Sequence, residues 1–126
     1  MRSIDVAWLF LLIALFITCQ PNPYRQGQVL YQMHCGNCHM EDGSGLSGLI
    51  PPLDGYGSWD LRPDSLVCII RRGLPVNPET GQSMPPNRVL NHVEMANLLN
   101  YLMSLYSKNE SAVQVAEVTS WSESCQ

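Results

Sequence analysis

The stretch YQMHCGNCHMEDGSG, residues 31–45, contains two cysteines three positions apart and a histidine directly after the second. A disulfide between Cys35 and Cys38 would close a very small loop and would give His39 no role. A redox-active dithiol with this spacing normally follows a strand, and no strand pattern precedes these residues. A zinc site would need two more cysteine or histidine ligands at short spacing, and none follows within 25 residues.

The remaining interpretation is covalent haem attachment, for which C-x-x-C-H is the typical pattern. The thiols of Cys35 and Cys38 add to the two vinyl groups of haem, whose separation explains the spacing of the cysteines. The tether then holds the iron over the next residue, which makes His39 the predicted proximal ligand. We therefore expect one covalently bound haem c with its iron.

The composition is that of one globular domain. The chain has 126 residues, a length that favours a single domain, and 45% of them are hydrophobic and 14% charged. The formal net charge of −4 argues against a nucleic-acid partner, which would require a basic face on the protein.

The N-terminus carries an uncharged apolar run, VAWLFLLIALFITC, at residues 6–19. A membrane-spanning helix needs roughly 20 apolar residues, so this shorter run is better interpreted as the apolar region of a secretory signal. The run ends at Cys19 and resembles a bacterial lipoprotein signal, from which it departs at Phe16 and Thr18. An ordinary signal peptide and an uncleaved short anchor are the alternatives. Each interpretation places the following domain outside the cytoplasm, in the periplasm.

Apolar residues at helical spacing predict an all-α fold. Short helices are expected within residues 24–35 and 64–73, and a longer one within residues 91–107. The last begins with a predicted capping box, in which Asn91 is the N-cap and Glu94 follows three residues later. Three main helices with long Gly/Pro loops make a thin core for a polypeptide alone, and a buried haem would supply the missing apolar mass.

These motifs resemble those of small bacterial monohaem cytochromes c of the mitochondrial-like class, over most of residues 24–106. The resemblance implies the class I cytochrome c fold around one covalent haem. It places Gly27 and Tyr31 on the first helix, where the C-terminal helix crosses closely enough to require a glycine. Leu98 and Tyr101 of that last helix are expected to meet them.

The resemblance also implies the surroundings of the iron. A Gly-rich loop follows His39 and leads to the element PPLDG, residues 51–55. The backbone carbonyl of Pro51 is expected to accept a hydrogen bond from His39 Nδ1–H and so to fix its tautomer. The distal ligand of this family is a methionine in a loop before the last helix, which indicates Met84 in GQSMPPN.

Other residues are weaker candidates as ligands. Met95 and Met103 lie in the last predicted helix, where methionine most often fills the core. His34 is expected at the surface, and His92 is expected to be exposed at the start of the last helix. A five-coordinate or bis-histidine iron is the alternative to ligation by Met84.

Two polar residues are candidates for contacts with the haem propionates, namely the Trp59 indole N–H and the Arg71 guanidinium. For Arg71 the alternative is a solvated basic helix end, which is favourable at a helix C-terminus. Cys68 lies in an apolar predicted helix and is expected to be a buried free thiol, with pairing to Cys125 as the alternative.

The expected organisation has four parts. They are a signal sequence (1–18), with Cys19 as the candidate lipidated residue, a linker (19–23), a cytochrome c domain (24–107) and a tail (108–126). The tail can pack on the domain as a short helix or serve a partner.

The site predicts a one-electron carrier rather than an enzyme, because an iron with both axial positions filled has no place for a small-molecule substrate. The expected electron donor is a quinol-oxidising complex or a dehydrogenase, and the expected acceptor is a terminal oxidase or reductase. Attachment to the membrane would come from lipid on Cys19 or from the apolar N-terminus itself. The alternatives are a fixed haem c subunit of a larger membrane redox complex, and a haem sensor or weak peroxidase if Met84 is not a ligand.

Overall fold

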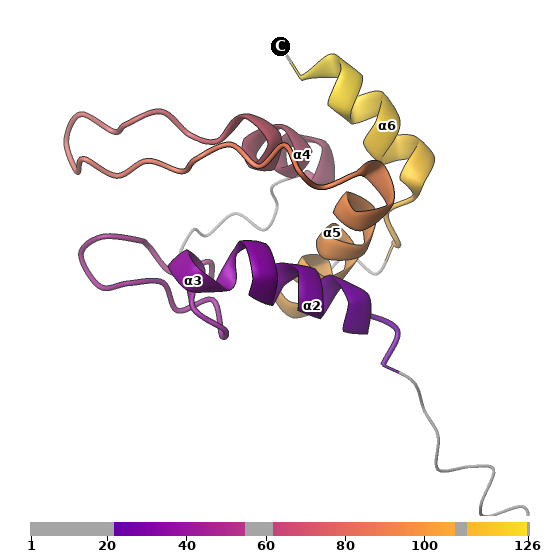
Figure 1. Ribbon diagram of the computed structural model, residues 1–126, viewed down its shortest axis with the longest axis horizontal. Helices are drawn as coiled ribbons and strands as arrows, with labels where there is room; N and C mark the ends of the chain where they lie inside the picture. Colours follow the sequence, from indigo (N-terminus) through magenta and orange to yellow (C-terminus); the bar gives the residue numbers. More distant parts are fainter. Residues whose placement is uncertain (1–21, 55–61, 108–110, 126) are drawn as a thin grey trace, which may run out of the picture.

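The computed structural model describes residues 22–54, 62–107 and 111–125. Within these ranges the chain forms helices joined by long loops, and its only strand-like pairs are two isolated bridges (Figure 1). The helices are α2 (Arg25–His34), α3 (Gly36–His39), α4 (Pro63–Arg72), α5 (His92–Tyr106) and α6 (Val115–Ser124). The predicted all-α fold is confirmed.

The most extensive helix contact is the crossing of α2 and α5. It is close because Gly27 has no side chain: a β-carbon there would collide with the Asn97 carbonyl oxygen and the Tyr101 side chain. One turn further along α2, the rings of Tyr31 and Tyr101 lie 5.8 Å apart between centroids. The contact predicted between the first and last helices is therefore confirmed for Gly27, Tyr31 and Tyr101.

Helix α5 provides more of the core than any other helix. Its predicted capping box is confirmed: Glu94 N donates to Asn91 Oδ1 at 2.9 Å, and Asn91 N donates to Glu94 Oε2 at 2.8 Å. Six of its side chains are buried, and they are those of Met95, Ala96, Leu98, Leu99, Leu102 and Met103. The two methionines thus fill the core, as expected from their helical spacing.

Helix α4 begins with Pro63 in the first helical position, where proline is well tolerated. It buries a stripe formed by Leu66, Val67 and Ile70. The helix ends at Gly73, which has a positive φ of 70°. Its main helix contact is with α6, and its contact with α5 is smaller.

The C-terminal tail packs back onto α4 and α5. Val113 and Val118 are buried, and the Asn100 side chain holds the Val113 backbone by two hydrogen bonds of 2.8 and 3.0 Å. Helix α6 is also joined to α4 by a disulfide between Cys68 and Cys125. The prediction of a free Cys68 thiol was wrong, because only the return of the tail brings these two Cα atoms, 57 residues apart in sequence, to 5.3 Å.

Three of the sequence predictions concern residues outside the described ranges. They are the apolar run at residues 6–19, the lipidation of Cys19 and the propionate contact of Trp59. Within the described ranges, no helix combines the length and the apolar character that crossing a bilayer would require.

Candidate functional site

The C-x-x-C-H motif forms a single helical turn. Helix α3 spans Gly36–His39, and Cys35 precedes it, accepting hydrogen bonds at its carbonyl from Cys38 N at 3.0 Å and from His39 N at 2.9 Å. Both thiols are free, with Cys35 half-buried and Cys38 exposed. Among the described residues, no three His, Cys, Asp or Glu side chains are placed so that they could hold one metal ion together. The turn therefore presents two free thiols and an imidazole within five residues.

Burial sets the protonation of these groups. Burial, with a smaller contribution from the neighbouring Cys38, raises the pKa of the Cys35 thiol to about 11. Burial also lowers the pKa of His39 below its usual value, because it penalises the charged imidazolium. His39 is therefore neutral at neutral pH, which is the form of imidazole that binds a metal.

The loop after His39 brings Pro51 back toward the motif. Gly45 N donates to the His39 carbonyl at 3.0 Å, and a β-carbon on Gly45 would collide with the carbonyl groups of Ile50 and Pro51. His39 Nδ1 is buried and has no hydrogen-bond partner within the described ranges. The hydrogen bond from His39 Nδ1–H to the Pro51 carbonyl therefore stays a prediction. The Pro51 carbonyl lies against Gly45, which is itself hydrogen-bonded to the backbone of His39.

Met84 lies at the base of the loop that follows α4. Its backbone pairs with Leu74 through hydrogen bonds of 2.8 and 3.1 Å. Gly73 makes this pairing possible, since a β-carbon there would collide with the Met84 carbonyl. Asn87 N donates to the Ile70 carbonyl at 2.8 Å and closes the loop back onto α4. The half-buried Met84 side chain packs against the hydrophobic core.

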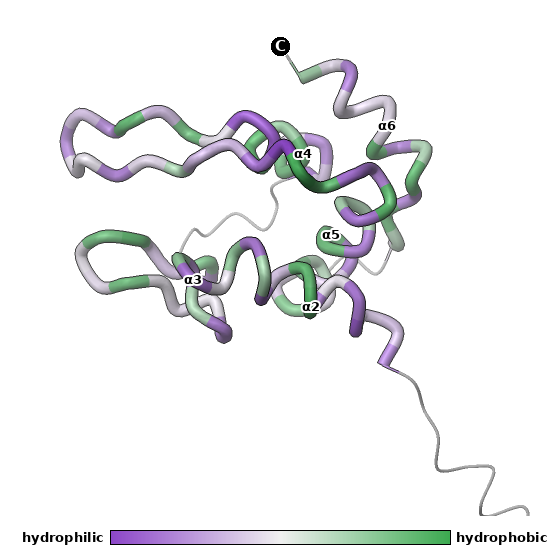
Figure 2. Tube along the Cα trace, in the orientation of Figure 1, coloured by the Kyte–Doolittle hydropathy of each residue, from purple (hydrophilic) through white to green (hydrophobic). Residues whose placement is uncertain are grey.

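The loops that carry Pro51 and Met84 expose apolar side chains. Both loops extend in the same direction from the helices, and Figure 2 shows apolar stretches in each. The exposed apolar residues are Leu46, Leu49, Leu74 and Val76, with exposed fractions of 44–64%. These residues offer two thiols, a neutral imidazole with an unpartnered buried nitrogen and a thioether. Such side chains, beside apolar loops, are of the types that suit a large flat apolar cofactor with a metal at its centre.

Residues 22–102 match the family model described as cytochrome C oxidase, cbb3-type, subunit III. The chain belongs to this family. No curated protein matches the sequence. The matched domain is that of a small c-type cytochrome, so the protein binds haem c covalently and functions in haem-based electron transfer.

Histidines other than His39 have no evident role at the site of this c-type cytochrome. His34 is exposed, as predicted. His92 is half-buried rather than exposed, because α6 packs over the start of α5 and brings the Thr119 hydroxyl to 3.0 Å from His92 Nδ1. The Thr119 hydroxyl donates to the Val115 carbonyl, so it accepts from His92 Nδ1–H.

The predicted propionate contact of Arg71 stays a prediction. In the structure Arg71 Nε donates to Ser122 Oγ at 3.1 Å, so this side chain contributes to the contact between α4 and α6. The neighbouring Arg72 is exposed at the end of α4.

Two tyrosine hydroxyls contact the loop after His39, and sequence reasoning missed both contacts. Tyr31 donates to the Met40 carbonyl at 2.7 Å, and Tyr106 donates to the Asp42 carbonyl at 3.2 Å. For Tyr31 the sequence held one signal: its ring was expected in the contact between the first and last helices, and a buried tyrosine hydroxyl usually finds a hydrogen-bond partner. Nothing local to Tyr106 indicates a contact with a residue 64 positions away.

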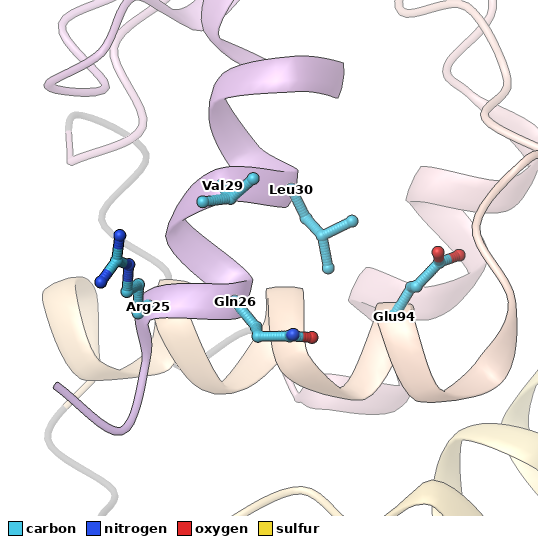
Figure 3. A pocket seen from close by; sticks show the side chains of 5 residues that line it. All are labelled: Arg25, Gln26, Val29, Leu30 and Glu94. Carbon is cyan, nitrogen blue, oxygen red and sulfur yellow. The ribbon is translucent and has the colours of Figure 1, made fainter. Parts of the chain in front are cut away.

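A separate pocket lies where the first turns of α2 and α5 meet (Figure 3). Its lining consists of Arg25, Gln26, Val29, Leu30 and Glu94. The haem motif follows the opposite end of α2, and a helix of ten residues is about 15 Å long. This pocket is therefore distinct from the site that the motif forms.

Proposed function

We propose that this cytochrome is an exported one-electron carrier of a respiratory chain. In this proposal Cys35 and Cys38 would hold the haem through thioethers, and His39 and Met84 would bind its iron. Haem c supplies one-electron redox chemistry, and a methionine opposite histidine raises its potential. With both residues bound to it, the iron would have no open position for a substrate. A high-potential carrier with no small-molecule substrate follows from this ligand set.

The observation that carries the proposal is the turn formed by residues 35–39. It holds two free thiols and a neutral histidine together, whereas the other two cysteines of the described residues are joined as a disulfide. Free thiols at the C-x-x-C spacing are what thioether formation requires. The Met84 loop, tied to the end of α4 at both of its ends, supports methionine as the second ligand.

Export is supported by two independent features. The Cys68–Cys125 disulfide is typical of an oxidising compartment such as the bacterial periplasm. The apolar run that ends at Cys19 suits a secretory signal, and lipid on this cysteine would attach the domain to a membrane. The partners that suit such a carrier are a quinol-oxidising complex or a dehydrogenase as donor, and a terminal oxidase or reductase as acceptor.

The family description favours a second candidate, in which the protein is a fixed haem c subunit of a larger membrane redox complex. Solubilisation in a mild detergent, followed by native size measurement, separates the two. A carrier migrates as a single small chain, whereas a subunit remains with its complex and co-purifies in fixed ratio. Salt-resistant co-purification with other redox proteins would replace the carrier proposal by this candidate.

Covalent attachment is tested by extraction with acidified acetone. Haem should stay with the wild-type polypeptide, because thioethers resist this treatment. In the variant with Cys35→Ala and Cys38→Ala it should pass into the organic phase or fail to bind. Replacement of the exposed His34 by alanine is the matched control, since it lies beside the motif and should leave attachment unchanged. Free haem extracted from the wild type would contradict the proposal.

A further inference from the structure

Met40, directly after His39, has an unusual backbone conformation. Its φ is 62° and its ψ is 164°, and it is the only residue other than glycine with a positive φ in the described ranges. This region of backbone space is almost restricted to glycine, because a β-carbon is crowded there. Such a conformation persists only where surrounding contacts enforce it, and strained residues of this kind cluster at functional sites.

Two hydroxyls from the crossing helices supply those contacts. Tyr31 of α2 donates to the Met40 carbonyl at 2.7 Å, and that carbonyl also accepts from Gly43 N at 3.3 Å. Tyr106 at the end of α5 donates to the Asp42 carbonyl at 3.2 Å. A β-carbon on Gly43 would collide with the Tyr106 hydroxyl, so the loop passes closely over this ring.

Both tyrosine rings pack against the core, Tyr31 within it and Tyr106 at its edge. Tyr31 is only 2% exposed, and its ring lies against Tyr101 in the tightest part of the crossing between α2 and α5. Burial raises the pKa of Tyr31 well above its usual value, so its hydroxyl remains a donor throughout the physiological range. The Tyr31 hydroxyl therefore reaches the loop from the tightly packed crossing of α2 and α5, and the Tyr106 hydroxyl reaches it from the end of α5.

The contacts continue from the loop to His39. Gly45 N donates to the His39 carbonyl at 3.0 Å, and Leu53 N donates to the Gly43 carbonyl at 2.8 Å. The first of these bonds fixes the carbonyl of His39, the last residue of α3. The second fixes the stretch that carries the Pro51 carbonyl.

We infer that the hydroxyls of Tyr31 and Tyr106 are positioning groups for His39. They hold residues 40–45 in a conformation that the chain would not adopt by itself, and that segment sets the backbone and the surroundings of the imidazole. The inference rests on the proposed function in one respect, which is that His39 is the iron ligand.

The test compares Tyr31→Phe and Tyr106→Phe with Tyr101→Phe in the haem-bearing protein. Tyr101 is the matched control, because its ring joins the same cluster while its hydroxyl has no hydrogen-bond partner among the described residues. Hydrogen exchange is followed by NMR in the reduced form at Gly45 N–H, Leu53 N–H and His39 Nδ1–H. Loss of one hydrogen bond should accelerate exchange at these positions about tenfold. Val113 N–H, held by Asn100 in the contact between α5 and the C-terminal tail, should be unaffected.

A second measurement tests whether Tyr31 enforces the strain at Met40. In the Met40→Gly background the backbone no longer needs to be forced into this conformation, so Tyr31→Phe should accelerate exchange at Gly45 N–H less than it does in the wild type. Equal acceleration in both backgrounds would overturn the role of Tyr31 as the group that holds Met40.

The inference is overturned if Tyr31→Phe and Tyr106→Phe resemble Tyr101→Phe at all three loop positions. It is also overturned if exchange rises equally at Val113 N–H, because that would indicate general destabilisation. The proposed function can fail separately: the wild-type spectrum shows whether His39 has the strongly shifted resonances of a haem ligand, whereas the backbone amides report the loop contacts in either case.

Discussion

The disulfide between Cys68 and Cys125 gives the most quantitative prediction. Replacement of both cysteines by serine removes a crosslink that closes a loop of 57 residues. The chain-entropy relation assigns about 4 kcal/mol of stabilisation to a crosslink over a loop of this length. Both side chains are half-buried, so the serine hydroxyls can remain partly solvated and add little further cost.

The structure also predicts where the loss will be felt. Helix α4 packs mainly against α6, and its C-terminal end ties down the loop that carries Met84. After the disulfide is removed, the hydrogen bond between Arg71 and Ser122 still joins α6 to α4. The burial of Val118 and the contact of Thr119 with His92 also hold α6 to the domain. Loosening of α6 should therefore make the Met84 loop open more readily than the part of the chain around α2.

The assay is guanidinium unfolding of the haem-bearing protein, followed by helical circular dichroism and haem absorbance. The free energy of unfolding of a small protein falls by about 4 kcal/mol per molar guanidinium. The variant with both Cys68→Ser and Cys125→Ser should therefore unfold at a guanidinium concentration about 1 M lower than the wild type. The single variants should each reproduce this loss, because either one breaks the same bond. A midpoint within about 0.2 M of the wild type would refute the reasoning and show that packing alone retains α6.

Further predictions concern the distal ligand, the helix crossing and the anchor. Met84→Ala should keep its covalent haem but have a lower reduction potential and bind carbon monoxide when reduced; each 59 mV lost corresponds to about 1.4 kcal/mol. An unchanged potential and unchanged carbon monoxide binding would mean that the distal ligand is another residue. Gly27→Ala should lower the free energy of unfolding by about 1–3 kcal/mol, measured by thermal denaturation, since its methyl group would meet Asn97 and Tyr101. A variant as stable as the wild type would contradict the close crossing. Cys19→Ser should release the haem-bearing domain into the soluble periplasmic fraction, whereas retention in the membrane fraction would assign anchoring to the apolar run or to a partner.

Local sequence patterns predicted the helices because the causes of those helices are local. The capping box of Asn91 and Glu94 involves residues three positions apart, and α5 follows directly from it. Helix α4 ends at Gly73, because the positive φ of that residue is easily adopted by glycine and does not continue a helix. The crossing of α2 and α5 was also expected, although from the resemblance to cytochromes c and not from periodicity. Covalent haem c was indicated by the C-x-x-C-H motif, and the class of small c-type cytochrome by that motif together with the surrounding residues that resemble cytochromes c.

Contacts between distant residues could not be predicted in this way. The apolar helix around Cys68 favoured a free buried thiol, and only the return of α6 provides the partner. The same packing half-buries His92, which would otherwise be exposed at the start of α5. The positive φ of Met40 has no sequence signal, because methionine does not favour that conformation by itself.

The sequence by itself therefore determined the chemistry of the protein: the thiols, the imidazole and the thioether are properties of residue types at given spacings, and covalent haem attachment depends on residues within one helical turn. Only the tertiary structure decided how that chemistry is held in place. The hydroxyls of Tyr31 and Tyr106 reach the loop after His39, and α6 is fastened over α4. The reason is physical: spacing along the chain specifies which neighbours a residue has within a turn or two, whereas contacts across 57 or 64 residues depend on how every intervening element packs.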